Sequence, residues 1–171
     1  MYYGQLIKDC TSDGPGVRIS LYVSGCRNHC KGCHNLQSQD FKFGNLFGED
    51  VIKEILKEIS KPYIRGLTLC GGDPMEKENR TELLPFLKII KEQFPEKDIW
   101  CYTGYTWNEV KNFEIMKYID VLVDGPFIIN KRDITINNLW RGSTNQRVID
   151  VKASLNNNNR QINLKDIPNN D

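Results

Sequence analysis

Short apolar segments that alternate with amphipathic ones are the strongest structural constraint on this chain. Three helices are expected between the apolar segments: one over residues 49–59, one within 81–94, and one that begins with the capping-box pattern of 106–109. Strands joined through helices run parallel within one sheet, so the sequence predicts an α/β fold. The five expected strands cover residues 18–24, 66–70, 98–103, 118–125 and 147–153.

Chain length limits which α/β fold is possible. The chain has 171 residues, whereas a closed eight-stranded β/α barrel takes about 250 residues. We therefore expect a partial, open (β/α) barrel of about five mostly parallel strands, or a small doubly wound sheet. In either fold, ligands bind at the carboxyl ends of the strands. Four sequence features fall at such ends: the segment 24–35, Gly71-Gly72, Thr103-Gly104 and Asp124-Gly125.

Composition argues against several classes of partner. The chain has 23 Lys+Arg and 22 Asp+Glu, with no run of basic residues, so we expect no nucleic-acid partner. The N-terminal residues lack the pattern of a signal peptide, and no apolar segment approaches the ~20 residues that cross a bilayer. We expect a cytoplasmic protein without a membrane partner. In that reducing compartment, six cysteines are more typical of metal binding than of disulfides.

Three of the six cysteines lie close together in the segment SGCRNHCKGCHN. Cys26, Cys30 and Cys33 have the spacing C-x3-C-x2-C and directly follow an expected strand. Gly25 and Gly32 accompany them, and glycine permits the backbone to curl tightly. The segment is therefore a candidate metal-binding loop.

Four interpretations of this loop remain open on spacing alone. Three of them are a helical stripe, a disulfide with one spare thiol, and a structural zinc site whose fourth ligand is His29, His34 or Cys10. The fourth, which we favour, is a four-iron cluster held by three thiolates. Such clusters usually have four cysteine ligands, so three leave one iron open to a further ligand. Cys10, Cys70 and Cys101 are expected to fill the core.

Beyond the spacing, the loop resembles the signature of the radical S-adenosylmethionine (SAM) enzymes. The stretch SDGPGVRISLYVSGC resembles the start of the glycyl-radical-enzyme activases, and CKGCHN resembles one branch of the superfamily. Most radical SAM enzymes have an aromatic residue where this chain has Gly32. The segments YIRGLTLCGGDP, FPEKDIWCYTGY, KYIDVLVDGPF and LWRGSTNQR complete an ordered set. The set resembles the family that activates anaerobic ribonucleoside-triphosphate reductases.

The resemblance implies a domain organisation and a set of cofactors. Residues 1–154 would form a radical SAM domain, followed by a polar, Asn-rich tail over 155–171. The cofactors implied are a [4Fe–4S] cluster and SAM, with Cys26, Cys30 and Cys33 as the metal ligands. The residues implied to bind or pack beside the cofactor are His34, Gly71, Gly72, Asp73, Pro74, Thr103 and Asp124.

The resemblance does not assign a single role to two arginine-containing segments. Arg18, in the pattern D-G-P-G-x-R, has either a structural role near the cysteine loop or a direct one. The segment with Arg141 and Arg147 is characteristic of the family, and we interpret it as a partner-docking segment.

The resemblance also implies an activity and two protein partners. One electron from a flavodoxin-type donor would reduce the cluster, and SAM would be cleaved to methionine and a 5′-deoxyadenosyl radical. That radical would take a hydrogen atom from a glycine Cα in the large subunit of the anaerobic ribonucleoside-triphosphate reductase. No side chain of the chain itself is expected to be catalytic. The alternatives are another small radical SAM enzyme, with a different glycyl-radical enzyme or a small molecule as substrate, and a non-enzymatic zinc-binding module.

Overall fold

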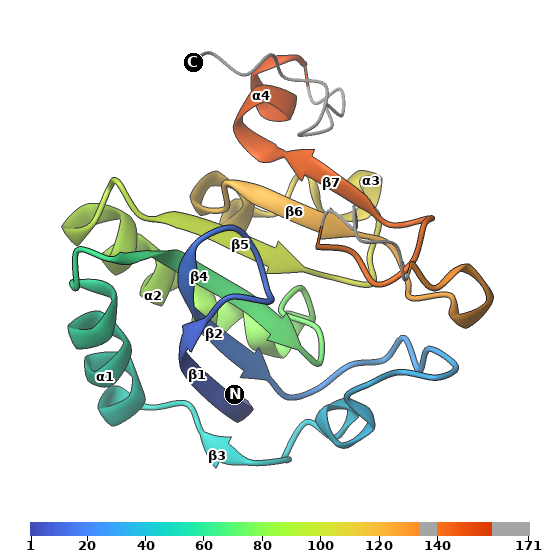
Figure 1. Cartoon of the computed structure of the whole chain (residues 1–171), viewed down its shortest axis with the longest axis horizontal. Helices are drawn as coiled ribbons and strands as arrows, with labels where there is room; N and C mark the ends of the chain where they lie inside the picture. Colours follow the sequence, from blue (N-terminus) through green and yellow to red (C-terminus); the bar gives the residue numbers. More distant parts are fainter. Residues whose placement is uncertain (134–139, 159–171) are drawn as a thin grey trace.

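The chain folds around a single seven-stranded sheet, seen in a computed structural model that describes residues 1–133 and 140–158 (Figure 1). The strand order is β3-β1-β2-β4-β5-β6-β7. Four central strands are mutually parallel: β2 (Val17–Val23), β4 (Ile64–Gly71), β5 (Asp98–Tyr102) and β6 (Val121–Asp124). The antiparallel strands that flank them are β1 (Tyr2–Cys10), β3 (Asn45–Leu46) and β7 (Arg147–Asp150).

The predicted α/β class with a largely parallel sheet is confirmed, but the strand count of about five is wrong. The two strands that the sequence reasoning missed are β1 and β3. β1 contains Gly4, Lys8 and Asp9, which are uncommon in strands, and β3 has only two residues. Whether the open sheet curves as a partial barrel stays a prediction.

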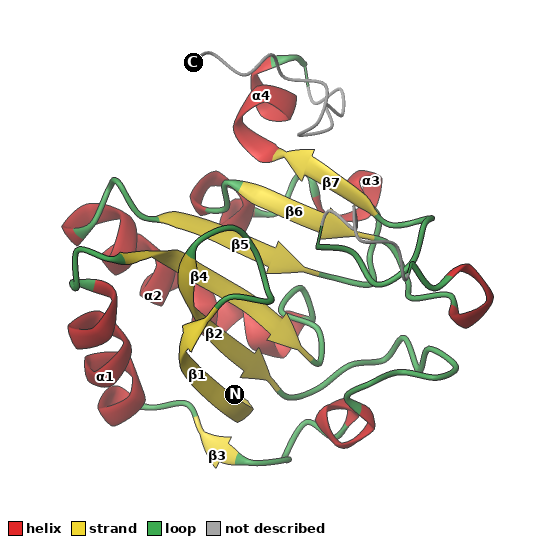
Figure 2. Ribbon diagram, viewed as in Figure 1, coloured by secondary structure: helices red, strands yellow, loops and turns green. Residues whose placement is uncertain are grey.

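Helices occupy the connections between the parallel strands (Figure 2). The bounds of α1 (Glu49–Ile59) match the expected helix. α2 (Lys77–Gln93) begins four residues before the expected interval 81–94, and the sequence did not reveal this start because the first turn of the helix is polar. Pro85 lies within α2, on its exposed side. α3 (Trp107–Val110) starts at the predicted capping box of Thr106 and Glu109. The other helices are η1 (Leu36–Gln39), η2 (Glu114–Tyr118), η3 (Ile129–Lys131) and α4 (Val151–Asn156).

Two expected strands were drawn too long. The interval 118–125 begins in η2, since Tyr118 is the last residue of that 3₁₀ helix. The interval 147–153 runs into α4, because the side chain of Asp150 accepts a hydrogen bond from the Ala153 N–H at 2.7 Å and caps the helix. The expected domain boundary at 154/155 therefore falls inside α4, and residues 159–171 of the expected tail lie outside the described residues. None of the described helices is long and apolar enough to cross a membrane.

Alternation of side chains gives the sheet two different faces. One face is apolar and packs with α1 and α2 in the main core, to which the central strands contribute Ile19, Leu21, Val23, Leu67, Leu69, Ile99, Cys101 and Leu122. The intervening side chains point to the other face, where Val121 and Val123 of β6 lie beside more polar or aromatic residues, among them Arg18, Tyr22, Thr68, Cys70, Trp100 and Tyr102. The chemistry that the chain can offer therefore lies on this second face and at its edge.

Arg18 is the central polar residue of the second face. It is fully buried, its Nε donates to Thr68 Oγ1 at 2.8 Å, and its guanidinium lies 5.5 Å from the ring centroid of Trp100. It also forms an ion pair with Asp98 at 2.5 Å and donates to the carbonyl of Pro15 at 3.2 Å. Arg18 thus connects the loop before β2 to β4 and β5. Of the two roles considered for Arg18, structural or direct, these contacts support the structural one.

Candidate functional site

A cavity of about 370 Å³ lies at the carboxyl ends of the parallel strands. Its walls combine the cysteine loop after β2, the Gly-Gly-Asp turn after β4 and the Thr-Gly turn after β5. A fourth wall comes from residues 140–142, far along the chain. Gly125 at the end of β6 also lines the cavity. The predicted convergence is therefore present for all four strand-end features, and the cavity is the candidate site.

The three clustered cysteines all line this cavity. Cys26, Cys30 and Cys33 are free and half-buried. They lie in a non-helical loop, so the interpretation as a helical stripe is wrong. Burial raises the pKa of Cys26 above its usual value, opposed by hydrogen bonds from Asn28, and the charge of Asp73 raises it further.

The donor chemistry of the loop fits an iron–sulfur cluster. Cysteine thiolates are the usual ligands of such clusters, and the loop offers three thiols to one cavity.

Within residues 1–133 and 140–158, no three His, Cys, Asp or Glu side chains are arranged to hold a metal ion. Two proposed fourth zinc ligands have other partners: His29 Nδ1 lies 2.9 Å from Gln39 Oε1, and Cys10 Sγ lies 3.3 Å from Ser12 Oγ.

Glycines let the cysteine loop take its shape. Gly25 has φ +99°, and a Cβ placed there would lie 2.2 Å from the ring of Phe41. Gly32 has φ +76°, and a Cβ there would lie 3.1 Å from the side chain of Ile129. Positive φ values of this size favour glycine strongly. The expectation that both glycines permit a tight curl is confirmed.

The cysteine loop rests directly on the Gly-Gly-Asp turn. The Gly72 N–H donates to the Val23 carbonyl at 2.7 Å, and the Asp73 N–H donates to the Gly25 carbonyl at 2.8 Å. A Cβ at Gly72 would lie 2.6 Å from the carbonyl oxygen of Gly25. Gly72 therefore allows close approach of two backbones.

Asp73 holds the site together from within. Its carboxylate is fully buried and accepts four hydrogen bonds. The hydroxyl of Thr103 and the N–H of Met75 donate to Oδ1 at 2.7 and 2.9 Å, while the Gly104 N–H and the Asn28 amide donate to Oδ2 at 2.9 and 3.0 Å. Burial raises the pKa of Asp73 to about 6, opposed by these donors. The carboxylate therefore joins the three strand ends.

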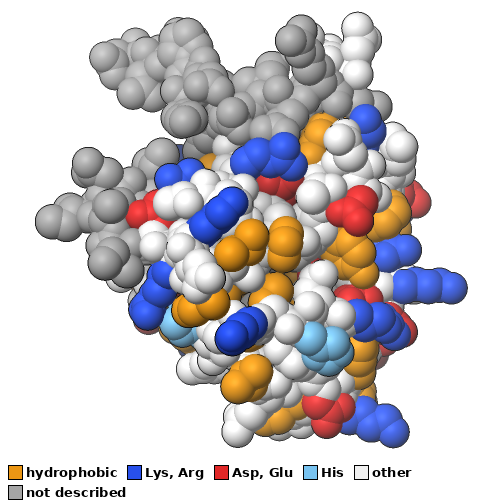
Figure 3. All heavy atoms as spheres, turned by 90° about the vertical axis from the view of Figure 1, so that its right-hand side faces the viewer, with side chains coloured by type: hydrophobic (Ala, Val, Ile, Leu, Met, Phe, Trp, Pro, Cys, Tyr) orange, Lys and Arg blue, Asp and Glu red, His pale blue; other side chains and the backbone are white. Residues whose placement is uncertain are grey.

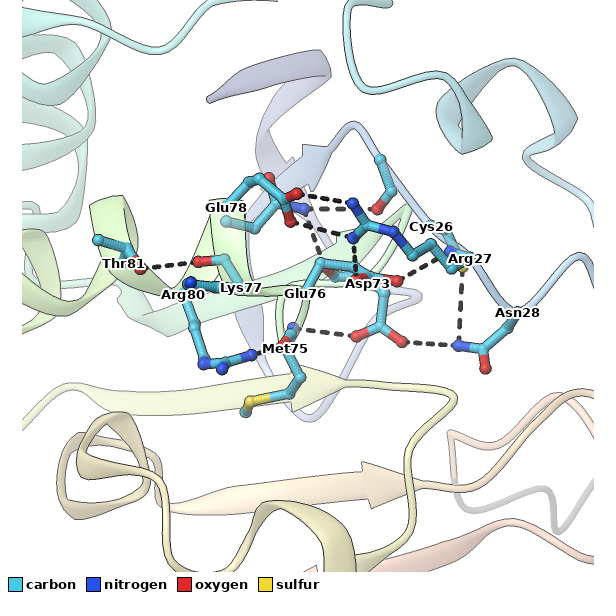
Figure 4. A network of polar contacts seen from close by, with 12 residues as sticks. Cys26, Arg27, Asn28, Asp73, Met75, Glu76, Lys77, Glu78, Arg80 and Thr81 are labelled. Carbon is cyan, nitrogen blue, oxygen red and sulfur yellow. Dashed lines mark hydrogen bonds and ion pairs between the residues drawn. The ribbon is translucent and has the colours of Figure 1, made fainter.

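A charged network fixes the cysteine loop to the start of α2 (Figure 4). The backbone N–H of Arg27 donates to Glu76 Oε1 at 2.8 Å, and its guanidinium pairs with Glu76 at 2.5 Å and with Glu78 at 2.6 Å. The guanidinium also lies 4.3 Å from the ring centroid of Phe41. The residue that follows Cys26 is thus held from three directions.

Asn79 of α2 completes this attachment. Its side-chain amide donates to the carbonyls of Ser24 at 3.0 Å and Asp73 at 2.8 Å, with a longer contact to that of Gly25 at 3.4 Å. Sequence reasoning missed Asn79 because a polar residue near the start of a helix gives no signal by itself.

Two of the seven predicted cofactor-binding residues do not line the cavity. Pro74 and Asp124 are both buried and absent from the cavity lining. Asp124 Oδ1 accepts from Arg147 Nε at 2.8 Å, and its Oδ2 accepts from Arg147 Nη2 and from the Trp107 N–H, the latter at 2.6 Å. Through these hydrogen bonds, the Asp124 side chain joins β6 to β7 and to α3.

The other predicted residues do line the cavity: His34, Gly71, Gly72, Asp73 and Thr103. Of these, His34 is exposed and its ring centroid lies 5.7 Å from that of Phe127. Its position fits the packing role expected for it. No finding tests which of these residues contact a cofactor, so the assignments stay predictions.

Several cavity-lining residues were not singled out from the sequence. Asp13, whose Oδ2 accepts from the Tyr22 hydroxyl at 2.6 Å, lies in the wall beside Tyr102. Asp13 belongs to the D-G-P-G pattern, which was quoted for the resemblance but not treated as part of a site. Trp140 is a second such residue, and its neighbour Arg141, which was predicted to take part in docking, also lines the cavity. Thus the segment interpreted as a docking segment forms part of the cavity wall.

The three isolated cysteines are all buried, as expected of core residues. Cys101 and Cys10 are 0% and 4% exposed, and Cys70 is 8% exposed. Burial raises the pKa of Cys70 and of Cys101 well above the usual value. Cys70 nevertheless contributes to the cavity lining.

Comparisons with known proteins agree with this site. Residues 12–149 match the family described as a 4Fe-4S single cluster domain. The chain is 43% identical over 136 residues to the anaerobic ribonucleoside-triphosphate reductase-activating protein of Enterobacteria phage T4, covering 80% of this chain and 85% of the relative. Its identity to the proteins of that name from Pasteurella multocida and Haemophilus influenzae is 43% over 152 residues and 41% over 150 residues. Each alignment covers 85% of this chain, and 95% and 96% of the relatives. The chain therefore belongs to the family of anaerobic ribonucleoside-triphosphate reductase-activating proteins, with an iron–sulfur domain of the single-cluster kind.

Proposed function

We propose that this chain is a radical SAM enzyme that installs a glycyl radical on the large subunit of an anaerobic ribonucleoside-triphosphate reductase. The observation that carries the proposal is the meeting of three half-buried thiols and the Gly-Gly-Asp turn in one cavity. The names of the relatives support the partner. The electron donor that we assign is a flavodoxin-type protein, and the compartment is the cytoplasm.

Each part of the chain has a task in this proposal. Cys26, Cys30 and Cys33 would hold a [4Fe–4S] cluster, and residues 71–74 would contact SAM at its amino group. With an electron from the external donor, the bound cluster and SAM would supply the radical chemistry that removes hydrogen from a glycine Cα. The protein binds, orients and shields these groups rather than reacting itself.

The cavity walls explain how the chain keeps its geometry during this work. Asp73 joins the cysteine loop to the ends of β4 and β5, and Arg27 clamps that loop to α2. Rigid placement of the reacting groups is the protein's main contribution to such chemistry. Tyr22, Tyr102 and Trp140 give the cavity an aromatic lining that limits access of water.

A macromolecular substrate needs an accessible approach, and we assign it to the side shown in Figure 3. That side carries the loops at the right of Figure 1, and Lys and Arg side chains are interspersed there with hydrophobic ones. Leu36, the first residue of η1, and Ile128, which precedes η3, are 64% and 37% exposed. Such a mixed surface suits a transient protein partner.

The proposal is tested by anaerobic reconstitution with iron and sulfide, followed by reaction with SAM and a chemical reductant. Wild-type protein should absorb near ~400 nm, as expected of a thiolate-bound iron cluster, and should release 5′-deoxyadenosine and methionine. Cys30→Ala should abolish both the absorption and the cleavage, whereas Cys101→Ala is the matched control and should retain both. A colourless protein that binds zinc instead contradicts the proposal.

A further inference from the structure

The side chain of Asn28 connects a proposed cluster ligand to the buried carboxylate of the site (Figure 4). Its Nδ2 lies 3.7 Å from Cys26 Sγ and 3.0 Å from Asp73 Oδ2. A side-chain amide nitrogen carries two hydrogens, so it can serve both acceptors at once.

Two neighbours fix the direction of this amide. Asp73 is fully buried and anchored by Thr103 and by backbone N–H groups, so its Oδ2 is a stationary acceptor. Gly104 lies directly against Asn28, because a Cβ at that position would be 2.2 Å from Asn28 Nδ2. The second hydrogen of the amide is consequently held toward the sulfur.

Within the part of the chain that the structure describes, Asn28 is the only side chain that hydrogen-bonds a sulfur of the cysteine loop. Hydrogen bonds to the sulfurs are among the factors that set the reduction potential of an iron–sulfur cluster. One-electron reduction adds negative charge to the cluster and its ligands. A donor at a ligand sulfur stabilises that charge, and its loss makes the potential more negative.

We propose that Asn28 is a positioning residue that raises the reduction potential of the cluster by donating to the Cys26 sulfur. The inference rests on the proposed function in one respect, the binding of a cluster by Cys26. Asp73 and Gly104 act through Asn28, one by holding the amide and the other by leaving room for it. A merely structural role for Asn28 would leave the potential unchanged.

The test is a redox titration of the reconstituted protein without SAM, followed by electron paramagnetic resonance of the reduced cluster. A hydrogen bond to a charged group is stronger than one between neutral groups, and part of its strength distinguishes the two oxidation states. Asn28→Ala should make reduction about tenfold less favourable, a midpoint shift of about 59 mV toward negative values.

Gly104→Ala tests the same hydrogen bond without removing Asn28. Its added methyl group should push the Asn28 amide away from Cys26 while Asn28 itself remains, and the shift should have the same sign. The double variant should show no further shift, because the second change has nothing left to remove.

The matched control is His29→Asn. His29 lies in the same loop but contacts Gln39 rather than a sulfur, and its φ of 45° suits asparagine. Its midpoint potential should equal that of the wild type.

The outcomes separate the inference from the proposed function. A cluster with the same potential in wild type, Asn28→Ala and Gly104→Ala overturns the inference and leaves the proposed function intact. Equal shifts in His29→Asn and Asn28→Ala also overturn it. A wild-type protein that binds no cluster contradicts both. If Asn28→Ala fails to hold a cluster, the potential of Gly104→Ala decides.

Discussion

The hydroxyl of Thr103 donates to Asp73 Oδ1 at 2.7 Å, so the polar ends of two neighbouring strands are bound to each other. Both residues line the cavity. Both were predicted from the sequence to contact a cofactor, yet their side-chain oxygens already have protein partners. The Thr103 oxygen also accepts from the Tyr105 N–H at 3.1 Å. The two residues would therefore contact a ligand mainly through their backbone atoms and through the shape that they give the cavity wall.

This relationship predicts a coupled loss of stability. Thr103→Val and Asp73→Asn should each lower the free energy of unfolding by about 1–3 kcal/mol, because each leaves buried polar groups unpaired. The double variant should lose less than the sum, since both changes remove the same hydrogen bond. Urea denaturation of the cluster-free protein measures all three. Strictly additive losses would mean that the two residues do not act together.

Gly25 offers a sharper test of the loop geometry. Gly25→Ala combines φ +99° with a Cβ only 2.2 Å from Phe41, so it should lower the free energy of unfolding by about 2–4 kcal/mol. The matched control is Gly48→Ala, where φ is −138° and no atom lies within 4 Å of the added Cβ. Gly48 is the N-cap of α1, where glycine is preferred to alanine, so that change should cost about 1 kcal/mol or less. Iron content after reconstitution should fall only for Gly25→Ala, and equal iron content would contradict the proposed tight fit.

Asp124 allows the structural and cofactor roles to be separated. Arg147→Met should lower the free energy of unfolding by about 2–4 kcal/mol, because it leaves a fully buried carboxylate without its cation. Asp124→Asn should also destabilise the protein, while the dissociation constant of SAM, measured in the loaded protein by calorimetry, stays close to that of the wild type. Weakened SAM binding without loss of stability would assign Asp124 to the cofactor instead.

The lowered pKa of Asp120 makes the free energy of unfolding depend on pH. Burial alone would raise the pKa of Asp120, but hydrogen bonds from Lys152, Lys91 and the Ile99 N–H lower it below its usual value. The unfolded chain then binds the proton more tightly, so this contribution is present above about pH 4 and is lost as pH falls through the lowered pKa.

The measurement is urea denaturation of wild type and Asp120→Asn from pH 7 to pH 2.5. The wild type should be more stable by about 1 kcal/mol at pH 7, a value that allows for partial exposure, and the difference should vanish at the acid end. Glu49→Gln is the control, because its ion pair with Lys53 is highly exposed and should have little effect. A difference that persists unchanged at pH 2.5 would contradict the assignment to ionised Asp120.

Sequence patterns predicted the parallel part of the fold because its signals are local. The strand cores around Leu69 and Cys101 are short apolar runs that end at Gly or Thr-Gly, and α1 has a complete amphipathic period. The edge strands were missed because their pairing, such as Tyr3 with Asn45, joins distant segments of weak strand character. The cap at Asp150 was missed because strand and helix meet there without a loop.

The site shows the same division between local and distant signals. The three clustered cysteines and the glycines Gly25 and Gly32 lie within one short stretch, so the sequence alone indicated a tightly curled candidate metal-binding loop. The contacts of Arg27 with Glu76 and of Asn28 with Asp73 span more than forty residues, and no periodicity encodes them. Thus the three cysteines proposed as metal ligands could be singled out from the sequence, whereas the residues that hold their loop in place required the fold.

The central claim is that this chain generates a glycyl radical on its reductase partner. The direct measurement is electron paramagnetic resonance of the cluster-loaded protein mixed anaerobically with SAM, a one-electron reductant and the large subunit of the cognate anaerobic ribonucleoside-triphosphate reductase. Wild type and Cys101→Ala should produce a glycyl-radical signal on the large subunit, and Cys30→Ala should produce none. Release of 5′-deoxyadenosine and methionine without any radical on that subunit would contradict the claim.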